Sequence, residues 1–522
     1  MRLVQIVATS LGWGRAGLVL VASLFCGVLR EEAREFTVMA YNVEMLFDVD
    51  GVSLFEDYKP PAWGPQQLDH KLAGISSVLR QVANGKGPDV ICFEEFEADQ
   101  TPESTVTDMD AFLRDWSTQK ATDLLRAPRL DPRLAGLPVQ AWLAKRLADD
   151  GLTGYHVAVG GWRNDPSGHL VFHTNVIFSR FPIVASRTHE TIGARGILEV
   201  QLDVDGNKLF VFDNHWKSGA SDPVTEDTRI GNAEVLRRRL DEILRKDPQA
   251  DVILAGDFNS QYNQKQRYPE MPRTAMNDVL GSQGDEVAFA RPDGPPLYNL
   301  WFELPPKKRG SDEYHHEWGT LMEILVTRGL YDFRGVQYVD NSFTVAAFPG
   351  LNANRETGQP VRWTFAGGGE GFSDHFPVIA TFRTTTDNDT SRWIQLTDPS
   401  HTPTGPAAAV PVKLPLESAV DLSTWPAGKE FRSAENVGQF FKVRGQVSSV
   451  RPFRVRVDGP KIDIAVWIYD HATREAYFAQ HGLGKRVSFV GELGQYRDEW
   501  QLVIPKKAAK PRSTERAPSG GE

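Results

Sequence analysis

The sequence predicts an α/β protein with a large domain and a smaller β-rich domain, and three observations support this prediction. The chain has 522 residues, more than one ordinary hydrophobic core accommodates. Short apolar runs alternate with helical segments along most of it. A stretch rich in Pro, Ala and Thr at 397–416 then separates this part from a segment in which strand-like runs dominate.

The strand candidates of the first part are short runs rich in β-branched and aromatic residues. Several are apolar nearly throughout, which is typical of strands covered on both faces. Helical periodicity predicts helices at 66–83, at about 137–150 and at 225–246. The strand candidates are 35–42, 88–95, 155–160, 170–179, 197–204, 208–214, 250–257, 321–327 and 376–382.

Residues 1–30 are typical of an export signal. Arg2 and Arg15 precede an apolar run at 16–29 that is near the length of a signal core and short for crossing a bilayer. An uncleaved anchor or a misassigned start codon are the alternatives. We expect a secreted or periplasmic protein with no further membrane span, and one without an internal disulfide, because only Cys92 follows this segment.

The charge is unevenly distributed along the chain. The net charge is −10, but residues 431–510 carry 14 Lys and Arg against 8 Asp and Glu, a local charge of +6. The acidic remainder argues against a protein that simply coats nucleic acid. The basic C-terminal part would assist contact with a polyanion.

Polar residues recur directly after the predicted strands, where strand ends of an α/β sheet converge on a common cleft. Each of them alone is more often a turn or core residue, and the adjacent Asp374 and His375 could be a surface accident, a ligand beside a proton carrier, or part of a hydrolytic triad. The recurrence at one end of successive strands favours a site. The candidates are Asn42, Glu44, Glu94, Glu95, His215, Asp257, Asn259, Asp374 and His375.

Six segments carry a resemblance to a known family. They are "YNVEMLFD" (41–48), "PDVICFEEF" (88–96), "NVIFSRFPI" (175–183), "NHWKS" (214–218), "GDFNS" (256–260) and "SDHFPV" (373–378). In this order they resemble the motifs of the endonuclease/exonuclease/phosphatase superfamily, which includes pancreatic-type deoxyribonucleases, apurinic endonucleases, inositol-phosphate phosphatases and neutral sphingomyelinases. The resemblance extends over 36–383 and implies a deoxyribonuclease-like two-sheet α/β sandwich with the active cleft at one edge.

The resemblance also implies a role for each candidate. Asp257 would orient or deprotonate the attacking water, Asn259 would hydrogen-bond the phosphate, and the imidazoles of His215 and His375 would contact the phosphate and shuttle protons. The metal-side residues would be Asn42, Glu44, Glu95 and Asp374. Oxygen ligands without a thiolate cluster suit Mg²⁺ or Mn²⁺. Lys217 and Arg180 are candidates for additional positive charge or for ordinary surface cations.

One position departs from the family pattern. The family places an aspartate, which orients the last histidine, where this chain has Met322, with Glu323 next to it. A shift of one residue along a strand turns a side chain to the opposite face. Glu323 would therefore replace that aspartate only through a bulge or an altered register, and His375 is expected to lack its usual partner otherwise.

The segment 437–504 has the element order of a small Greek-key barrel, five strand-like runs with a helix between the third and fourth, and resembles an OB-fold. Arg451, Arg454 and Arg456 alternate on one run and could share a face. The aromatic residues Phe453, Trp467 and Tyr469 could stack on bases or could fill the barrel core.

The predicted organisation is a signal peptide or anchor at 1–30, a catalytic domain at 35–385, a linker at 386–430, an OB-fold-like domain at 431–505 and a disordered tail at 506–522. The predicted function is that of a secreted metal-dependent phosphoric diester hydrolase, a nuclease that attacks DNA or RNA, with nucleic acid as its partner and no protein partner. A phosphatase or sphingomyelinase-type hydrolase and a weakly active nucleic-acid-binding protein are the alternatives. The oligomeric state stays open.

Overall fold

The computed structural model describes residues 33–505 except for short gaps at 102–105, 163–170, 292, 315–316, 366–367, 401–418, 427–428, 434–435, 469–470 and 497–498. The predicted export signal and the predicted tail lie outside the described residues. Within the described part, no helix is both long and apolar enough to cross a membrane.

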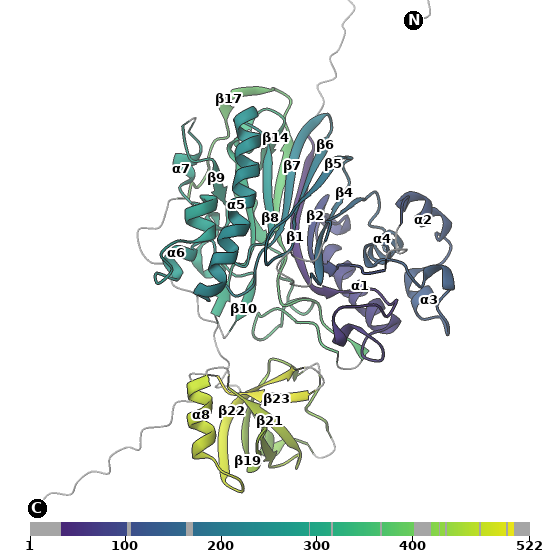
Figure 1. Ribbon diagram of the computed structural model, residues 1–522, viewed down its shortest axis with the longest axis vertical. Coiled ribbons are helices and arrows are strands. Elements are labelled where there is room, and N and C mark those ends of the chain that lie inside the picture. The colour runs from purple at the N-terminus through teal and green to yellow at the C-terminus, as the bar shows by residue number, and fades with distance from the viewer. Residues whose placement is uncertain are drawn as a thin grey trace, which may run out of the picture. The chain divides into compact units, whose positions relative to one another are not determined.

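Two mixed β-sheets form the body of the first domain (Figure 1). The first sheet has the order β14-β16-β1-β2-β4-β3, with β15 beside β16, and the second has the order β5-β6-β7-β8-β12-β9. Strands of the first sheet are β1 (Glu35–Leu46), β2 (Val90–Glu97), β3 (His156–Val159), β4 (His173–Ser179), β14 (Val336–Tyr338), β15 (Thr344–Val345) and β16 (Val378–Thr384). Those of the second are β5 (Ile183–His189), β6 (Ile197–Val204), β7 (Asn207–His215), β8 (Val252–Asp257), β9 (Leu297–Asn299) and β12 (Met322–Thr327).

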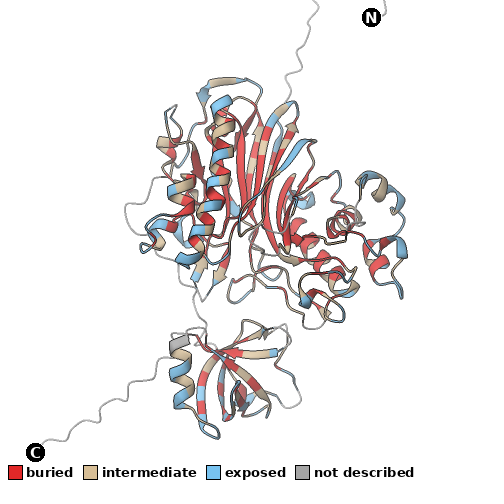
Figure 2. Ribbon diagram, viewed as in Figure 1, coloured by how far each residue is buried: buried red, intermediate tan, exposed pale blue. Residues whose placement is uncertain are grey.

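The two sheets pack face to face, and helices cover their outer faces. Along β1, Val38 and Ala40 point into the core between the sheets, whereas Met39 and Tyr41 point to the opposite side, where α1 packs. This alternation buries both faces of the strand, which explains its continuous apolar character (Figure 2). The two-sheet α/β sandwich is therefore confirmed.

The longer helices lie where the sequence predicts them. They are α1 (Pro65–Leu79), α4 (Val139–Asp149) and α5 (Pro223–Lys246), and α5 packs on the outer face of the second sheet. The shorter helices of this domain are α2 (Met109–Asp115), α3 (Ala121–Leu125), α6 (Gln264–Arg267) and α7 (Glu286–Phe289). A hairpin of β10 (Asp312–Tyr314) and β11 (Glu317–Gly319) precedes β12.

The C-terminal segment forms a closed barrel, as predicted. Strand β19 pairs with both β20 and β22, so the sheet β18-β19-β20-β21-β23-β22 closes on itself. A helix separates the third and fourth of its longer strands. The elements are β18 (Val420–Asp421), β19 (Phe440–Val450), β20 (Phe453–Val457), β21 (Asp463–Trp467), α8 (His471–Gln480), β22 (Arg486–Tyr496) and β23 (Glu499–Val503).

The side chains of the barrel divide between core and surface. Phe453 is buried and stacks on Phe478 with ring centroids 4.1 Å apart, so of its two possible roles the structure shows the one in the barrel core. Trp467 is 40% exposed, and Tyr469 lies outside the described residues. Arg454 forms an ion pair with Glu499, and Arg456 lies 3.5 Å from Asp463.

The segment predicted as a linker contains ordered strands at both ends. β17 (Asp389–Trp393) pairs with β13 (Asp332–Phe333) of the first domain, and β18 pairs with β19 of the barrel. The proposed domain boundaries stay a prediction, but the connection between the two sets of paired strands is shorter than 386–430.

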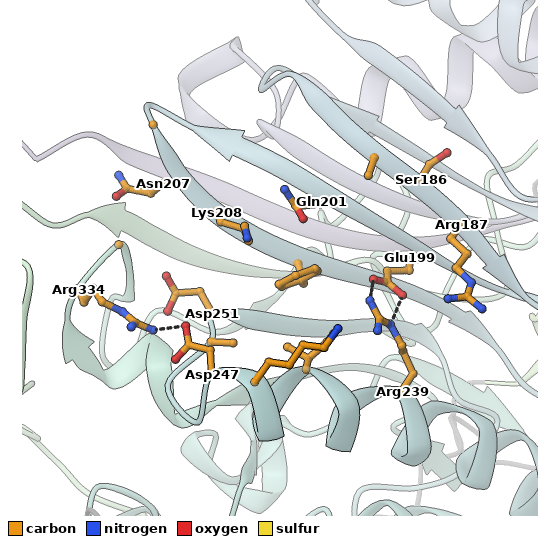
Figure 3. A pocket seen from close by; sticks show the side chains of 17 residues that line it. Ser186, Arg187, Glu199, Gln201, Asn207, Lys208, Arg239, Asp247, Asp251 and Arg334 are labelled. Atoms are coloured by element: carbon orange, nitrogen blue, oxygen red, sulfur yellow. Dashed lines mark hydrogen bonds and ion pairs between the residues drawn. The ribbon is translucent and has the colours of Figure 1, made fainter.

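A groove of about 710 Å³ lies on the outer face of the second sheet, beside the C-terminal end of α5 (Figure 3). In its wall, both oxygens of Glu199 accept hydrogen bonds from Arg239, at 2.7 and 2.8 Å, and Glu199 Oε2 lies 2.6 Å from His189 Nε2. Burial alone would raise the pKa of Glu199, but these partners outweigh it and lower the pKa to about 2. None of the predicted site residues lines this groove.

Replacing Glu199 by Gln is expected to lower the free energy of unfolding at pH 7 by about 2 kcal/mol, allowing for solvent in the groove. The folded-state pKa lies below the unfolded value, so this stabilisation is complete above about pH 4.5 and disappears as the pH falls towards 2. Urea unfolding at pH 7 and pH 3 measures both effects. Glu242→Gln, which removes a more exposed partner of Arg239, is the control. An equal loss at both pH values would contradict the assignment.

Candidate active site

The carboxyl ends of four strands bring the predicted residues together. β1 runs parallel to β2, and β7 runs parallel to β8, so each pair ends at one edge of its sheet. The segment before β16 joins them because β16 is antiparallel to β1, and Ser373 Oγ donates to the Asn42 carbonyl at 2.7 Å. This edge carries Asn42 and Glu44 on β1, Glu95 on β2, His215 on β7, Asp257 on β8, and Asp374 and His375 before β16.

Asp257 lies at the centre of these side chains. Its Oδ2 accepts a hydrogen bond from Asn42 Nδ2 at 3.0 Å and lies 3.7 Å from Nε2 of both His215 and His375. Asn42 Nδ2 also lies 3.1 Å from Glu95 Oε1, which is 3.8 Å from His215 Nε2. Residues separated by more than two hundred positions in the sequence therefore share one buried hydrogen-bonded cluster.

The second group at this edge consists of the carboxylates of Glu44, Glu95 and Asp374. Arg362 lies between two of them, 3.4 Å from Glu44 Oε1 and 3.3 Å from Asp374 Oδ2. Burial and the charge of Asp374 raise the pKa of Glu44 to about 7, and the same two causes raise the pKa of Glu95. These carboxylates thus repel one another and favour a neutralising cation.

The residues present fit a hard divalent cation. Glu44, Glu95 and Asp374 offer carboxylate oxygens, which are the ligands that Mg²⁺ and Mn²⁺ prefer. Asn42 Oδ1 accepts from the backbone N–H of Glu44 at 2.9 Å and its Nδ2 donates to Glu95 and Asp257, and its metal-side role stays a prediction. In this structure Asn42 positions the carboxylates around it.

Three of the predicted residues lie in the left-handed backbone region. The φ angles are 51° at Glu44, 67° at Glu95 and 46° at Asn259. Residues other than Gly rarely adopt such angles, and the surrounding structure must hold them there. The distortions at Glu44 and Glu95 coincide with register shifts in β1 and β2, which turn the ends of these strands and orient the side chains.

The two imidazoles have opposite electrostatic environments. Burial, followed by the charges of Arg195 and His173, lowers the pKa of His215 well below its usual value. Burial would also lower the pKa of His375, but Asp374, Asp257 and Asp312 outweigh it and raise the pKa to about 9. In the chain alone His215 is therefore neutral and His375 carries a proton at neutral pH.

Asn259 follows β8 and packs against Asp257. Its backbone N–H donates to Asp257 Oδ1 at 2.9 Å, and its Nδ2 donates to the Trp216 carbonyl at 3.2 Å. The side chain amide that would contact a phosphate is thus used within the protein here. Asn259 lies at the predicted site, but its predicted phosphate contact stays a prediction.

The cations of the site differ from those predicted. Arg180 lies over the ring of Tyr155, 3.4 Å from Asp89, and donates to backbone carbonyls, so it has a structural role. Lys71 on α1 is fully buried and donates to the carbonyls of Glu44 and Phe372, both at 2.8 Å. Burial lowers the pKa of Lys71 to about 8, against the opposing charges of Glu44 and Asp374.

Arg195, just before β6, is a second cation that sequence reasoning missed. Its guanidinium donates to His173 Nδ1 at 2.9 Å. Burial lowers the pKa of Arg195, and the charges of Glu95 and Asp257 oppose this shift. A cation directly before a strand that is antiparallel to β7 is the signal that could have indicated it, because such a strand begins at the edge where β7 ends. Lys217, at the end of the "NHWKS" motif, is half-buried.

Met322 and Glu323 keep a regular register on β12. Met322 pairs with Asp257 and packs in the core between the sheets, and Glu323 pairs with Gly256. Glu323 accepts a hydrogen bond from Asn299 Nδ2 at 2.5 Å on the opposite face. No register shift interrupts the pairing of β12 with β8, so Glu323 does not replace the family's aspartate.

A different carboxylate approaches His375. Asp312 of the β10–β11 hairpin forms an isolated antiparallel bridge with His375, so the two residues are cross-strand neighbours. Asp312 Oδ1 accepts from the Leu321 N–H at 3.0 Å, which fixes the carboxylate beside Met322. Asp312 is one of the charges that raise the pKa of His375. It lies in a polar segment without a strand-end motif, which is why the sequence did not indicate it.

Glu94 does not join the site. Its side chain turns away from Glu95 and faces Asp213 of β7, where burial and the charge of Asp213 raise its pKa well above the usual value. Burial likewise raises the pKa of Asp213. Two buried acids in this position are stable when they share a proton.

The comparisons agree with this geometry. Residues 171–384 match the model of the endonuclease/exonuclease/phosphatase family, which confirms the resemblance and the expected enzyme class. No curated protein matches the chain. Similar solved structures include truncated TDP2 from Caenorhabditis elegans (14% identity, 67% of this chain and 97% of that chain, TM-score 0.35), D. rerio TDP2 complexed with single-strand DNA product (15%, 67% and 98%, 0.35) and the human Nocturnin catalytic domain with bound sulfate (14%, 68% and 98%, 0.35). Similarities at this level carry no argument about the substrate.

Proposed function

Because residues 171–384 match the model of the endonuclease/exonuclease/phosphatase family, we propose that this protein is a phosphodiesterase that uses Mg²⁺ or Mn²⁺ to hydrolyse nucleic acid. The observation that carries the proposal is the position of Asp257, with Nε2 of both His215 and His375 at 3.7 Å. In this arrangement the aspartate can orient a water while an imidazole beside it holds a proton next to the phosphate.

The chain's own residues divide the work of in-line displacement at phosphorus. Asp257 orients the attacking water, His215 contacts a phosphate oxygen, and His375 holds a proton at Nε2 towards the leaving oxygen. Glu44, Glu95 and Asp374 would hold the divalent cation, which neutralises charge on the non-bridging oxygens when it is bound. Asn42 holds the carboxylates of Glu95 and Asp257 in position through its two hydrogen bonds.

Two features of the C-terminal part of the chain favour a polymeric substrate. Residues 431–510, which comprise the barrel and the first residues after it, carry a net charge of +6, which favours a polyanion. Trp467 is 40% exposed and has the Arg474 guanidinium 4.3 Å above its ring, a pair that could stack with a base. Export also remains a proposal, which the N-terminal sequence of the mature protein would test.

Release of acid-soluble nucleotides from plasmid, single-stranded DNA and RNA by purified residues 31–522 tests the function. We expect turnover that EDTA abolishes and that His215→Ala lowers by about three orders of magnitude, because a hydrogen-bond donor to the phosphate is lost. His156→Ala, at an exposed position on β3, is the matched control. Hydrolysis of sphingomyelin without turnover of any polynucleotide would favour the lipid-phosphodiester alternative, and activity that survives both EDTA and His215→Ala would refute the mechanism.

A further inference from the structure

A second group of acids lies at the ends of β1 and β2, outside the catalytic set. Asp48 and Asp50 follow β1, and Asp99 follows β2. Each of the three offers a carboxylate oxygen, and these oxygens all lie within 4.8 Å of one another. Glu97 joins the group by accepting a hydrogen bond from the Asp48 N–H at 2.9 Å.

Asp48 has an oxygen that nothing in the described part of the chain satisfies. The residue is only 4% exposed; its Oδ1 accepts from the Asp50 N–H at 3.0 Å, whereas its buried Oδ2 has no hydrogen-bond partner. Burial and the charge of Glu97 raise the pKa of Asp48 to about 9. An unpaired buried carboxylate is costly, so this oxygen indicates a missing cation.

We propose that Asp48, Asp50 and Asp99 bind a calcium ion. Ca²⁺ lies 2.3–2.6 Å from its oxygen ligands, so oxygens on opposite sides of the ion are up to about 5 Å apart. The three carboxylate oxygens lie within 4.8 Å of one another, close enough for one such ion to contact all of them. Mg²⁺ usually retains several waters and is bound through one or two carboxylates, whereas Ca²⁺ takes about six to eight oxygen ligands, so a group of three carboxylates favours Ca²⁺.

The hydrogen bonds around the group hold the two loops together in a geometry suited to an ion. Thr101 donates through its N–H to Asp99 Oδ1 at 2.7 Å and through its hydroxyl to Asp50 Oδ2. Trp63 Nε1 donates to the Asp48 carbonyl at 2.7 Å, which fixes the backbone from the other side. A bound Ca²⁺ would therefore brace the ends of the same strands that carry Glu44 and Glu95.

Terbium luminescence tests the site directly, because Tb³⁺ occupies Ca²⁺ sites and the Trp63 indole contacts Asp48. We expect full-length protein to show tryptophan-sensitised Tb³⁺ emission that Ca²⁺ displaces, and a melting temperature that rises with Ca²⁺. Asp48→Asn combined with Asp50→Asn is expected to weaken Ca²⁺ binding by about two orders of magnitude, since the number of charged ligands sets affinity. Without Ca²⁺ this variant is expected to melt no lower than the wild type, because it removes repulsion among the acids.

Two controls separate this site from the catalytic one. Glu95→Gln, at the catalytic edge, and Asp57→Asn, at an exposed position nearby, are both expected to retain the displaceable emission. Loss of the emission in Glu95→Gln, or its retention in Asp48→Asn/Asp50→Asn, would overturn the proposal, as would emission that Ca²⁺ does not displace. None of these measurements requires catalysis, so the result is independent of the proposed hydrolase activity.

Discussion

Asp257→Asn is expected to lower kcat by about three orders of magnitude and to leave KM nearly unchanged. The substitution preserves the size of the side chain and the oxygen that accepts from the Asn259 N–H at 2.9 Å. It removes the negative charge that lies 3.7 Å from each imidazole and the acceptor that Asn42 uses. Steady-state kinetics on a nucleic acid substrate at saturating Mg²⁺ measure the effect.

The matched control for this variant is Asp227→Asn, at an exposed position on α5. It makes the same chemical change at a solvent-exposed side chain of this helix and is expected to leave kcat unaltered. Circular dichroism and the melting temperature should show that Asp257→Asn remains folded, since burial raises the pKa of Asp257 and its charge is costly in the folded chain. A fully folded Asp257→Asn variant with wild-type kcat would exclude Asp257 from the reaction.

Most of the site could be predicted because its residues lie at the ends of predicted strands. β1, β2, β7 and β8 are apolar on both faces, so their polar residues can lie only at the ends, and the parallel pairs bring those ends to one edge. The motif order identifies the same positions, and the register of β12 places Met322 opposite Asp257. Local sequence thus contains the information on which residues meet.

The residues that the sequence did not indicate depend on contacts between distant segments. Lys71 belongs to an ordinary amphipathic helix, and only the carbonyls of Glu44 and Phe372 make it part of the site. The motif position of Arg180 leaves a site cation and a surface cation both open, because it does not reveal the contacts of Arg180 with Asp89 and Tyr155. Phe453 was equally ambiguous, since core and surface aromatics of a barrel strand differ only by register.

Asp312→Asn is expected to lower kcat by about 100-fold, with a small effect on KM. Asn keeps the oxygen that accepts from the Leu321 N–H, so the β10–β11 hairpin should retain its fold. The variant removes a carboxylate that is a cross-strand neighbour of His375. His375 Nδ1 is buried and has no hydrogen-bond partner in the described residues, so Asp312 acts on the imidazole through its charge.

The dependence on the leaving group distinguishes this role from simple structural support. If Asp312 helps His375 to protonate the leaving oxygen, the loss should shrink for an aryl phosphodiester such as bis(p-nitrophenyl) phosphate, whose leaving group needs no proton. Glu313→Gln, the next residue on β10, is the control and should behave as the wild type with both substrates. An equal loss on both substrates would mean that Asp312 only maintains the hairpin, and the absence of any loss would mean that His375 works without a carboxylate neighbour on that side. The expected pattern instead means that the carboxylate lost at Met322 has been supplied by a neighbouring hairpin.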